Sequence, residues 1–173
     1  MSSRRLRLRA LHNLKCKLEE PIMSKPDFAY DIYINASREE VWKGLLEPEF
    51  TRQYWFHDNV SDWQEGSRWE HRSRVGEKKV DIVGKVLESV LHEKLVLTWA
   101  RPGDEADPER TSRVTFELGD VDWPGGPWTS LHLEHTDFGD DHEMRDSVSG
   151  GWPMVLSGLK TLLEKGFDSD DGD

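Results

Sequence analysis

The sequence predicts an α+β domain in which one continuous antiparallel sheet is accompanied by helices near each end of the chain. Apolar and polar residues alternate through much of residues 68–136, which is the period of strands with one buried face. Short turn sequences separate these segments at hairpin spacing. Residues 152–165 instead place apolar side chains at helical spacing, so we expect a long helix after the sheet.

Residues 28–54 predict a strand and two short helices. Apolar residues occupy every second position from Phe28 to Ile34, which indicates a half-buried strand. Ser37 and Glu40 are three residues apart and precede an apolar stripe, as in a helical capping box. Pro48 ends this helix, and residues 49–54 form a second one.

The middle of the chain predicts further strands, each with one apolar face. Trp69 and His71 share the inner face of the first of them, and Leu97 and Trp99 share that face on another. The expected strands are residues 68–75, 79–90, 94–100, 113–118 and 130–136, with Phe116, Leu133 and His135 also facing inward.

The last predicted element is a helix whose apolar stripe includes Trp152, Leu156 and Leu159. A proline is tolerated only in the first turn of a helix, so we expect the main helix to start at Pro153. A break or kink is expected before it, at residues 150–151. Gly166 is a natural C-terminal stop.

The charge divides the chain into unequal parts. The whole chain of 173 residues carries a formal net charge of −11, although residues 1–25 hold seven Lys or Arg and only two acids. We therefore expect a basic, disordered leader at residues 1–24, one domain at residues 25–167 and an acidic, disordered tail at residues 168–173. The acidic domain argues against nucleic acid and anionic membranes as partners, because both attract positive charge.

Cysteine content and hydropathy point to a cytoplasmic protein. Cys16 is the single cysteine, so an internal disulfide and a cysteine-based metal site are excluded. No apolar run approaches the roughly 18 to 20 residues that cross a bilayer.

A series of short motifs carries a resemblance to one family. The motifs are Tyr33–Ser37, Glu40–Trp42, Tyr54–Trp55, Ser61–Trp63, Gly66–Ser67, Gly84–Glu88, Leu95–Trp99, Ser112–Leu118, His135 and Gly151–Glu164. Their order and spacing resemble the homologue family of the activator of heat-shock protein 90 ATPase (AHSA-like), in the START-like (SRPBCC) superfamily, over residues 27–166. The resemblance implies a helix-grip fold, in which a curved antiparallel sheet surrounds the C-terminal helix and leaves a cavity for a hydrophobic ligand. It implies no single activity, because relatives include lipid carriers, cyclases, hormone receptors and co-chaperone domains.

Tryptophan side chains dominate the expected cavity. Trp69 and Trp99 project inward from strands, Trp152 projects from the helix, and Trp55 is expected near the mouth. Aromatic walls with few polar groups are typical of an apolar ligand pocket, but the same rings are equally compatible with a filled core. The candidate ligand-binding residues are Trp55, Trp69, His71, Leu97, Trp99, Phe116, Leu133, His135, Trp152, Val155, Leu156 and Leu159.

Three histidines are candidate functional groups. His71 and His135 on the inner face either orient a ligand and exchange protons, or make structural hydrogen bonds, which we favour. His132 and His135 are three residues apart on a strand and therefore face opposite sides, so no metal site is expected. No cofactor is expected either.

The sequence lacks the motifs of nucleophilic catalysis and of phosphate binding. Cys16 lies outside the domain, and no serine sits in a glycine-flanked elbow. Residues 150–151 are glycines without the lysine of a phosphate loop, so we expect no intrinsic ATP hydrolysis.

Three functions remain as hypotheses, in decreasing order of support. The first is a non-catalytic, small-molecule binding or stress-associated START-like protein whose partner is an unidentified small hydrophobic molecule. The second is an enzyme of the cyclase or dehydratase type, acting on an aromatic or polyketide-like substrate with His71 or His135. The third is a chaperone-associated interaction module. A homodimer is left open.

Overall fold

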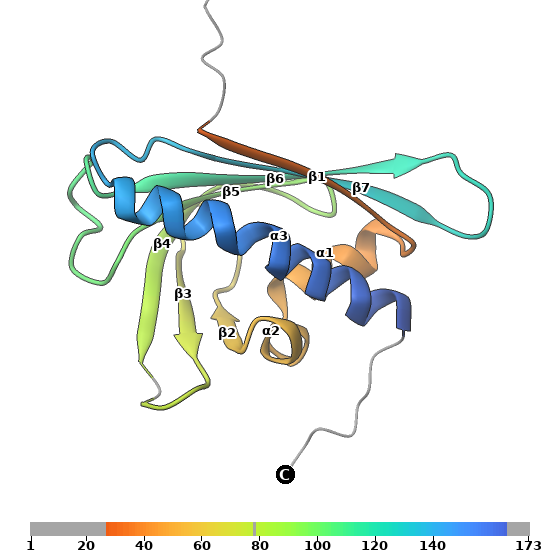
Figure 1. Ribbon diagram of the computed structural model, residues 1–173, viewed down its shortest axis with the longest axis horizontal. Helices are drawn as coiled ribbons and strands as arrows, with labels where there is room; N and C mark the ends of the chain where they lie inside the picture. Colours follow the sequence, from red (N-terminus) through yellow and green to blue (C-terminus); the bar gives the residue numbers. More distant parts are fainter. Residues whose placement is uncertain (1–26, 78, 166–173) are drawn as a thin grey trace, which may run out of the picture.

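Seven strands form one curved antiparallel sheet, and the C-terminal helix lies across its concave face (Figure 1). This computed structural model describes residues 27–77 and 79–165. The strand order is β1-β7-β6-β5-β4-β3-β2, so the last six strands form a meander and the first strand pairs with the last. The elements are β1 (Phe28–Ile34), α1 (Arg38–Leu46), α2 (Pro48–Tyr54), β2 (His57–Val60), β3 (Arg68–Ser73), β4 (Val80–Val90), β5 (Lys94–Trp99), β6 (Ser112–Val121), β7 (Trp128–Thr136) and α3 (His142–Lys165). The predicted fold class is confirmed.

Strand alternation places one set of side chains in the core. In β7, Leu131, Leu133 and His135 are fully buried, whereas the residues between them are partly exposed. The buried residues of the sheet pack with Leu156 and Leu159 of α3 in one hydrophobic core. The gripped helix therefore gains its stability from the apolar area that it buries against the sheet.

The capping box predicted at the start of α1 is present. The Ser37 side chain accepts a hydrogen bond from the Glu40 backbone N–H at 3.3 Å, and the Glu40 carboxylate accepts one from the Ser37 N–H at 2.7 Å. Two backbone donors that a helix start leaves unpaired are thereby satisfied.

Replacing Ser37 with alanine is expected to lower the free energy of unfolding by about 1 kcal/mol, because the cap acceptor is lost. Urea unfolding measures the change, and Ser37→Thr, which keeps a hydroxyl, is the control. Equal stability of the parent and Ser37→Ala would show that this cap contributes nothing.

Strand β2 was not among the predicted elements. Its sequence, His57–Val60, has only one aliphatic residue and no alternation of apolar side chains. It forms because its backbone pairs with β3, where Asn59 lies opposite His71. This edge strand therefore owes its conformation to tertiary pairing rather than to local sequence.

Gly84 in β4 has no side chain, which leaves room for the Thr98 backbone and the Trp69 indole. A Cβ atom on Gly84 would lie 1.8 Å from the Thr98 carbonyl oxygen and 2.3 Å from Trp69 Nε1. The indole N–H of Trp69 donates to that same carbonyl at 2.9 Å. Gly84 thus makes room for a hydrogen bond that fixes one inner tryptophan.

The prediction for the start of the C-terminal helix was wrong. Helix α3 begins at His142 and continues through Pro153, with no break at residues 150–151. Proline has no N–H for the carbonyl of Ser149, but burial of Met144 and a cap by Asp141 favour the earlier turns. Tertiary contacts therefore outweigh the local helix-breaking signal.

The ends of the predicted domain lie outside the described residues. The predicted leader, the predicted tail and Gly166 also lie outside the described residues. Within the described residues, none of the three helices has the length and apolar character that crossing a bilayer requires.

Candidate functional site

An aromatic cluster of Trp55, Trp69, His71, Trp99 and Trp152 lies between the sheet and α3. Trp69 and His71 come from β3, Trp99 ends β5, Trp152 belongs to α3, and Trp55 directly follows α2. The Trp99 ring is central, because its centroid is 5.2 Å from that of Trp69 and 5.4 Å from that of Trp152. Four members are at most 5% exposed, whereas Trp55 is half-buried.

The other predicted ligand-binding residues surround this aromatic cluster. The Phe116 ring meets Trp152 edge to face at 5.8 Å between centroids, and the His135 ring lies 5.6 Å from that of Trp99. The remaining members are buried or half-buried in the same core, namely Leu97, Leu133, Val155, Leu156 and Leu159. The structure therefore brings all the predicted residues into one inner region.

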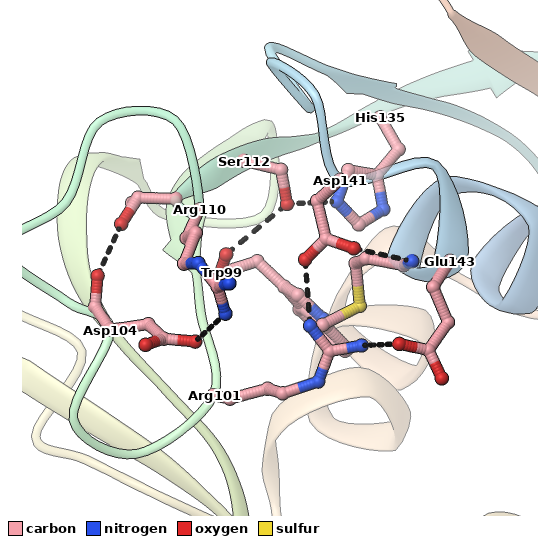
Figure 2. A network of polar contacts seen from close by, with 10 residues as sticks. Trp99, Arg101, Asp104, Arg110, Ser112, His135, Asp141 and Glu143 are labelled. Atoms are coloured by element: carbon pink, nitrogen blue, oxygen red, sulfur yellow. Dashed lines mark hydrogen bonds and ion pairs between the residues drawn. The ribbon is translucent and has the colours of Figure 1, made fainter.

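His135 is fully engaged in a chain of hydrogen bonds. Its Nδ1 accepts from the indole N–H of Trp152 at 3.0 Å, so its Nε2 carries the proton and donates to Ser112 Oγ at 2.8 Å. Ser112 in turn donates to the Trp99 carbonyl at 3.2 Å (Figure 2). Burial lowers the pKa of His135 to about 3, so the ring is neutral. Both ring nitrogens are occupied, as in a structural histidine.

His71 differs because only one of its nitrogens is occupied. Its Nδ1 lies 2.6 Å from Asn59 Oδ1, while the Asn59 amide donates to the Leu45 carbonyl at 2.9 Å. Burial, assisted by the neighbouring His57, lowers the pKa of His71 to about 3. No described residue is hydrogen-bonded to Nε2 of His71. The aromatic cluster therefore includes a neutral imidazole with a free ring nitrogen.

Trp99 carries a buried hydrogen-bond donor without a partner. Its Nε1 is inaccessible, and no described residue accepts a hydrogen bond from it. The indole N–H groups of Trp69 and Trp152, in contrast, donate to Thr98 and His135. Buried N–H groups are nearly always paired, so this exception is a feature that function can explain.

Trp55 covers the aromatic cluster from its exposed side. Its ring centroid lies 4.4 Å from that of His71, 5.4 Å from that of Trp152 and 6.3 Å from that of Trp99. The next residue, Phe56, has a φ of 58°, an uncommon conformation for a side chain of this size. Trp55 is thus the covering ring, and it belongs to a tight turn rather than to the sheet or to α3.

Sequence reasoning missed the residues that orient this site. His57 stacks on His71 with centroids 3.8 Å apart, and its Nδ1 donates to the Trp55 carbonyl at 2.7 Å. Asn59 fixes the other side of His71. Both lie on the unpredicted strand β2, so no sequence signal marked them. The other ring nitrogen of His57, Nε2, lies 3.1 Å from the carboxylate of Asp81.

Charged residues close the end of the site at which α3 begins (Figure 2). Arg101 is 2.6 Å from one carboxylate oxygen of Asp141, and the other oxygen accepts from the Met144 backbone N–H at 2.9 Å. Arg101 also lies 3.4 Å from Glu143. The hydrogen bond from Met144 and the Arg101 guanidinium hold the pKa of Asp141 below its usual range. These contacts hold the first turn of α3 against the loop after β5.

A curved antiparallel sheet closed around a long C-terminal helix defines a helix-grip protein of the START-like (SRPBCC) class. The solution structure of the Aha1 dimer from Colwellia psychrerythraea has this fold, with a TM-score of 0.64, 20% identity, and coverage of 82% of this chain and 98% of that one. ChR145 from Cytophaga hutchinsonii gives a TM-score of 0.58 at 26% identity, covering 82% and 97% of the two chains. CalU16 from Micromonospora echinospora gives 0.57 at 23% identity, covering 77% and 73%.

The sequence also matches a family description. Residues 35–164 match the family "Activator of Hsp90 ATPase homolog 1-like protein", so the chain belongs to this family. The comparison with curated proteins gives no match. The predicted resemblance is confirmed.

Proposed function

We propose that this protein binds a small apolar molecule at the aromatic cluster and does not transform it. The observation that carries the proposal is the unpartnered N–H of Trp99, which is buried among aromatic rings. Leaving such a donor unpaired costs about 1–3 kcal/mol. A ligand that supplies an acceptor would recover this free energy. The unpaired donor therefore favours binding of such a ligand.

Movement of the Trp55 side chain would open a path for the ligand into the aromatic cluster. The rings of the aromatic cluster contact one another, so a ligand needs one of them to move. Trp55 is half-buried, and its side chain can rotate away without breaking the hydrogen bonds of the sheet. A planar ligand would then occupy the position of the indole and stack on Trp99.

The properties of the histidines favour binding over cyclase or dehydratase chemistry. A general base works best with a pKa near the operating pH, whereas burial lowers the pKa of His71 and of His135 to about 3. His135 also has no free nitrogen. Both rings are better suited to orienting a ligand than to removing a proton.

Nile red binding tests this proposal. We expect the parent protein to bind the dye with quenching of tryptophan emission, and Trp55→Ala to bind it roughly three- to tenfold more tightly because the covering ring is gone. Leu91→Ala is the control, since Leu91 is 68% exposed on the turn after β4. Native mass spectrometry of the freshly purified protein would identify a co-purifying ligand. Exclusion of the dye by both the parent and Trp55→Ala would refute ligand binding and favour an interaction module.

A further inference from the structure

We infer that the ligand is an uncharged planar molecule with a hydroxyl group, which accepts a hydrogen bond from Trp99 Nε1 and donates one to His71 Nε2. This inference rests on the proposed function and specifies the chemistry of its ligand. The two rings are neighbours in the aromatic cluster, with centroids 6.1 Å apart. A ligand with two fused rings can span this separation, so one bound molecule can contact both side chains.

The acceptor character of His71 follows from its neighbour Asn59. The Asn59 amide nitrogen donates to the Leu45 carbonyl, which leaves the amide oxygen facing His71 Nδ1. An amide oxygen only accepts, so Nδ1 must carry the proton and Nε2 must present a lone pair. Asn59 is 5% exposed and its orientation is fixed by Leu45, so the tautomer is fixed as well. Asn59 is thus a positioning residue for ligand recognition.

The donor character of Trp99 leaves the ligand to supply the acceptor. An indole N–H can only donate, and the neighbouring N–H groups of Trp69 and Trp152 are donors that already have acceptors. Within the described residues, the four buried members of the aromatic cluster therefore offer one unused donor, on Trp99, and one unused acceptor, on His71. A hydroxyl group matches both, whereas a carbonyl or an ether oxygen matches only the donor.

The surroundings of these two atoms favour a neutral ligand. The members of the aromatic cluster carry no formal charge, since burial and the neighbouring His57 keep the pKa of His71 far below neutral pH. Burying a carboxylate or an ammonium group among them would leave that charge without a counter-ion. Flat aromatic surfaces on several sides favour a planar ring system, which stacks on them.

Three compounds of nearly equal shape test this inference. β-Naphthol can donate and accept, its methyl ether can only accept, and β-methylnaphthalene can do neither. Calorimetry should show that the parent protein binds β-naphthol about tenfold more tightly than the ether, and the ether more tightly than the hydrocarbon.

Two variants test which residue causes each difference in affinity among the three compounds. Trp99→Phe should remove the advantage of the ether over the hydrocarbon and leave binding of the hydrocarbon within about twofold of the parent, while β-naphthol keeps the advantage that it gains by donating to His71. His71→Phe should remove only the advantage of β-naphthol over the ether. If His71→Phe does not fold, the comparison of β-naphthol with the ether in the parent still tests the acceptor.

The outcomes separate this inference from the proposed function. Equal binding of all three compounds by the parent, or an equal loss of all three in Trp99→Phe, would overturn the inference while ligand binding stands. Equally tight binding of the ether and β-naphthol would overturn the hydroxyl and show that the ligand needs only an acceptor group. Binding of none of the compounds would overturn the proposed function itself.

Discussion

Replacing Trp152 with alanine is expected to lower the free energy of unfolding by about 3–5 kcal/mol. The side chain is 2% exposed and its ring lies within 5.8 Å of three aromatic rings, those of Trp55, Trp99 and Phe116. Its removal would leave a large cavity between α3 and the sheet. Urea unfolding monitored by far-ultraviolet circular dichroism measures the loss without relying on tryptophan emission.

Two matched variants divide this loss between packing and hydrogen bonding. Trp152→Phe retains much of the ring but removes the donor to His135 Nδ1, so a loss of about 1–3 kcal/mol is expected. Met154→Ala changes a residue of the same helix that is 76% exposed, and it should stay within about 0.5 kcal/mol of the parent. A loss below about 1 kcal/mol in Trp152→Ala would show that this ring does not hold α3 to the sheet.

The fold could be predicted largely from the period of apolar residues. In β3 the alternation put Trp69 and His71 on one face, and both are buried, whereas the intervening Glu70 lies on the other face and pairs with Arg68 and Arg72. Alternation works here because the inner face of the sheet is buried in the core that it shares with α3. The capping box at Ser37 is similarly local, since all its atoms lie within one helical turn.

The elements that sequence reasoning missed depend on distant contacts. Strand β2 pairs with β3 despite lacking apolar alternation, and the first turns of α3 are held by Asp141 and its partner Arg101. Arg101 and Asp141 lie 40 positions apart in the chain. Neither a two-residue period nor a capping pattern can report an interaction at that separation.

The polar chemistry of the site could not be predicted because it depends on rotamers. The sequence placed Trp99, His71 and His135 on the inner face but could not show that His135 has two partners, His71 one and the Trp99 indole none. It also left open whether the tryptophans line a cavity or fill it. In the structure their rings meet, so we expect entry of a ligand to depend on the half-buried Trp55.

Acidification is expected to destabilise the protein well before its carboxylates are protonated. Burial lowers the pKa of His71 and of His135 to about 3, far below the ordinary value of 6.5. Between these values the unfolded chain binds protons that the folded protein excludes, so stability is full above about pH 6.5 and falls as the pH drops. Each histidine removes about 1.4 kcal/mol per pH unit in this range.

Other groups contribute little or oppose this trend between pH 7.5 and 5. The pKa of His132 is raised on the outer face, because hydrogen bonds to Asp31 and Glu134 outweigh partial burial, so its contribution is present at low pH and is lost as the pH rises. The carboxylates of Glu70 and Asp141 have lowered pKa values, and their contributions are lost only at more acidic pH. The change in stability between pH 7.5 and 5 therefore comes mainly from the two buried histidines.

Urea unfolding at pH 7.5 and pH 5 should consequently reveal a loss of about 4 kcal/mol, half from each buried histidine. His71→Gln and His135→Gln keep polar atoms at these positions but cannot titrate there, so each should remove about half of the pH dependence, even if its stability at pH 7.5 is lower. His132→Gln is the control on the outer face, and it should leave the decline at least as steep. A parent whose stability is the same at both values would show that these two rings accept protons in the folded state as readily as in the unfolded chain.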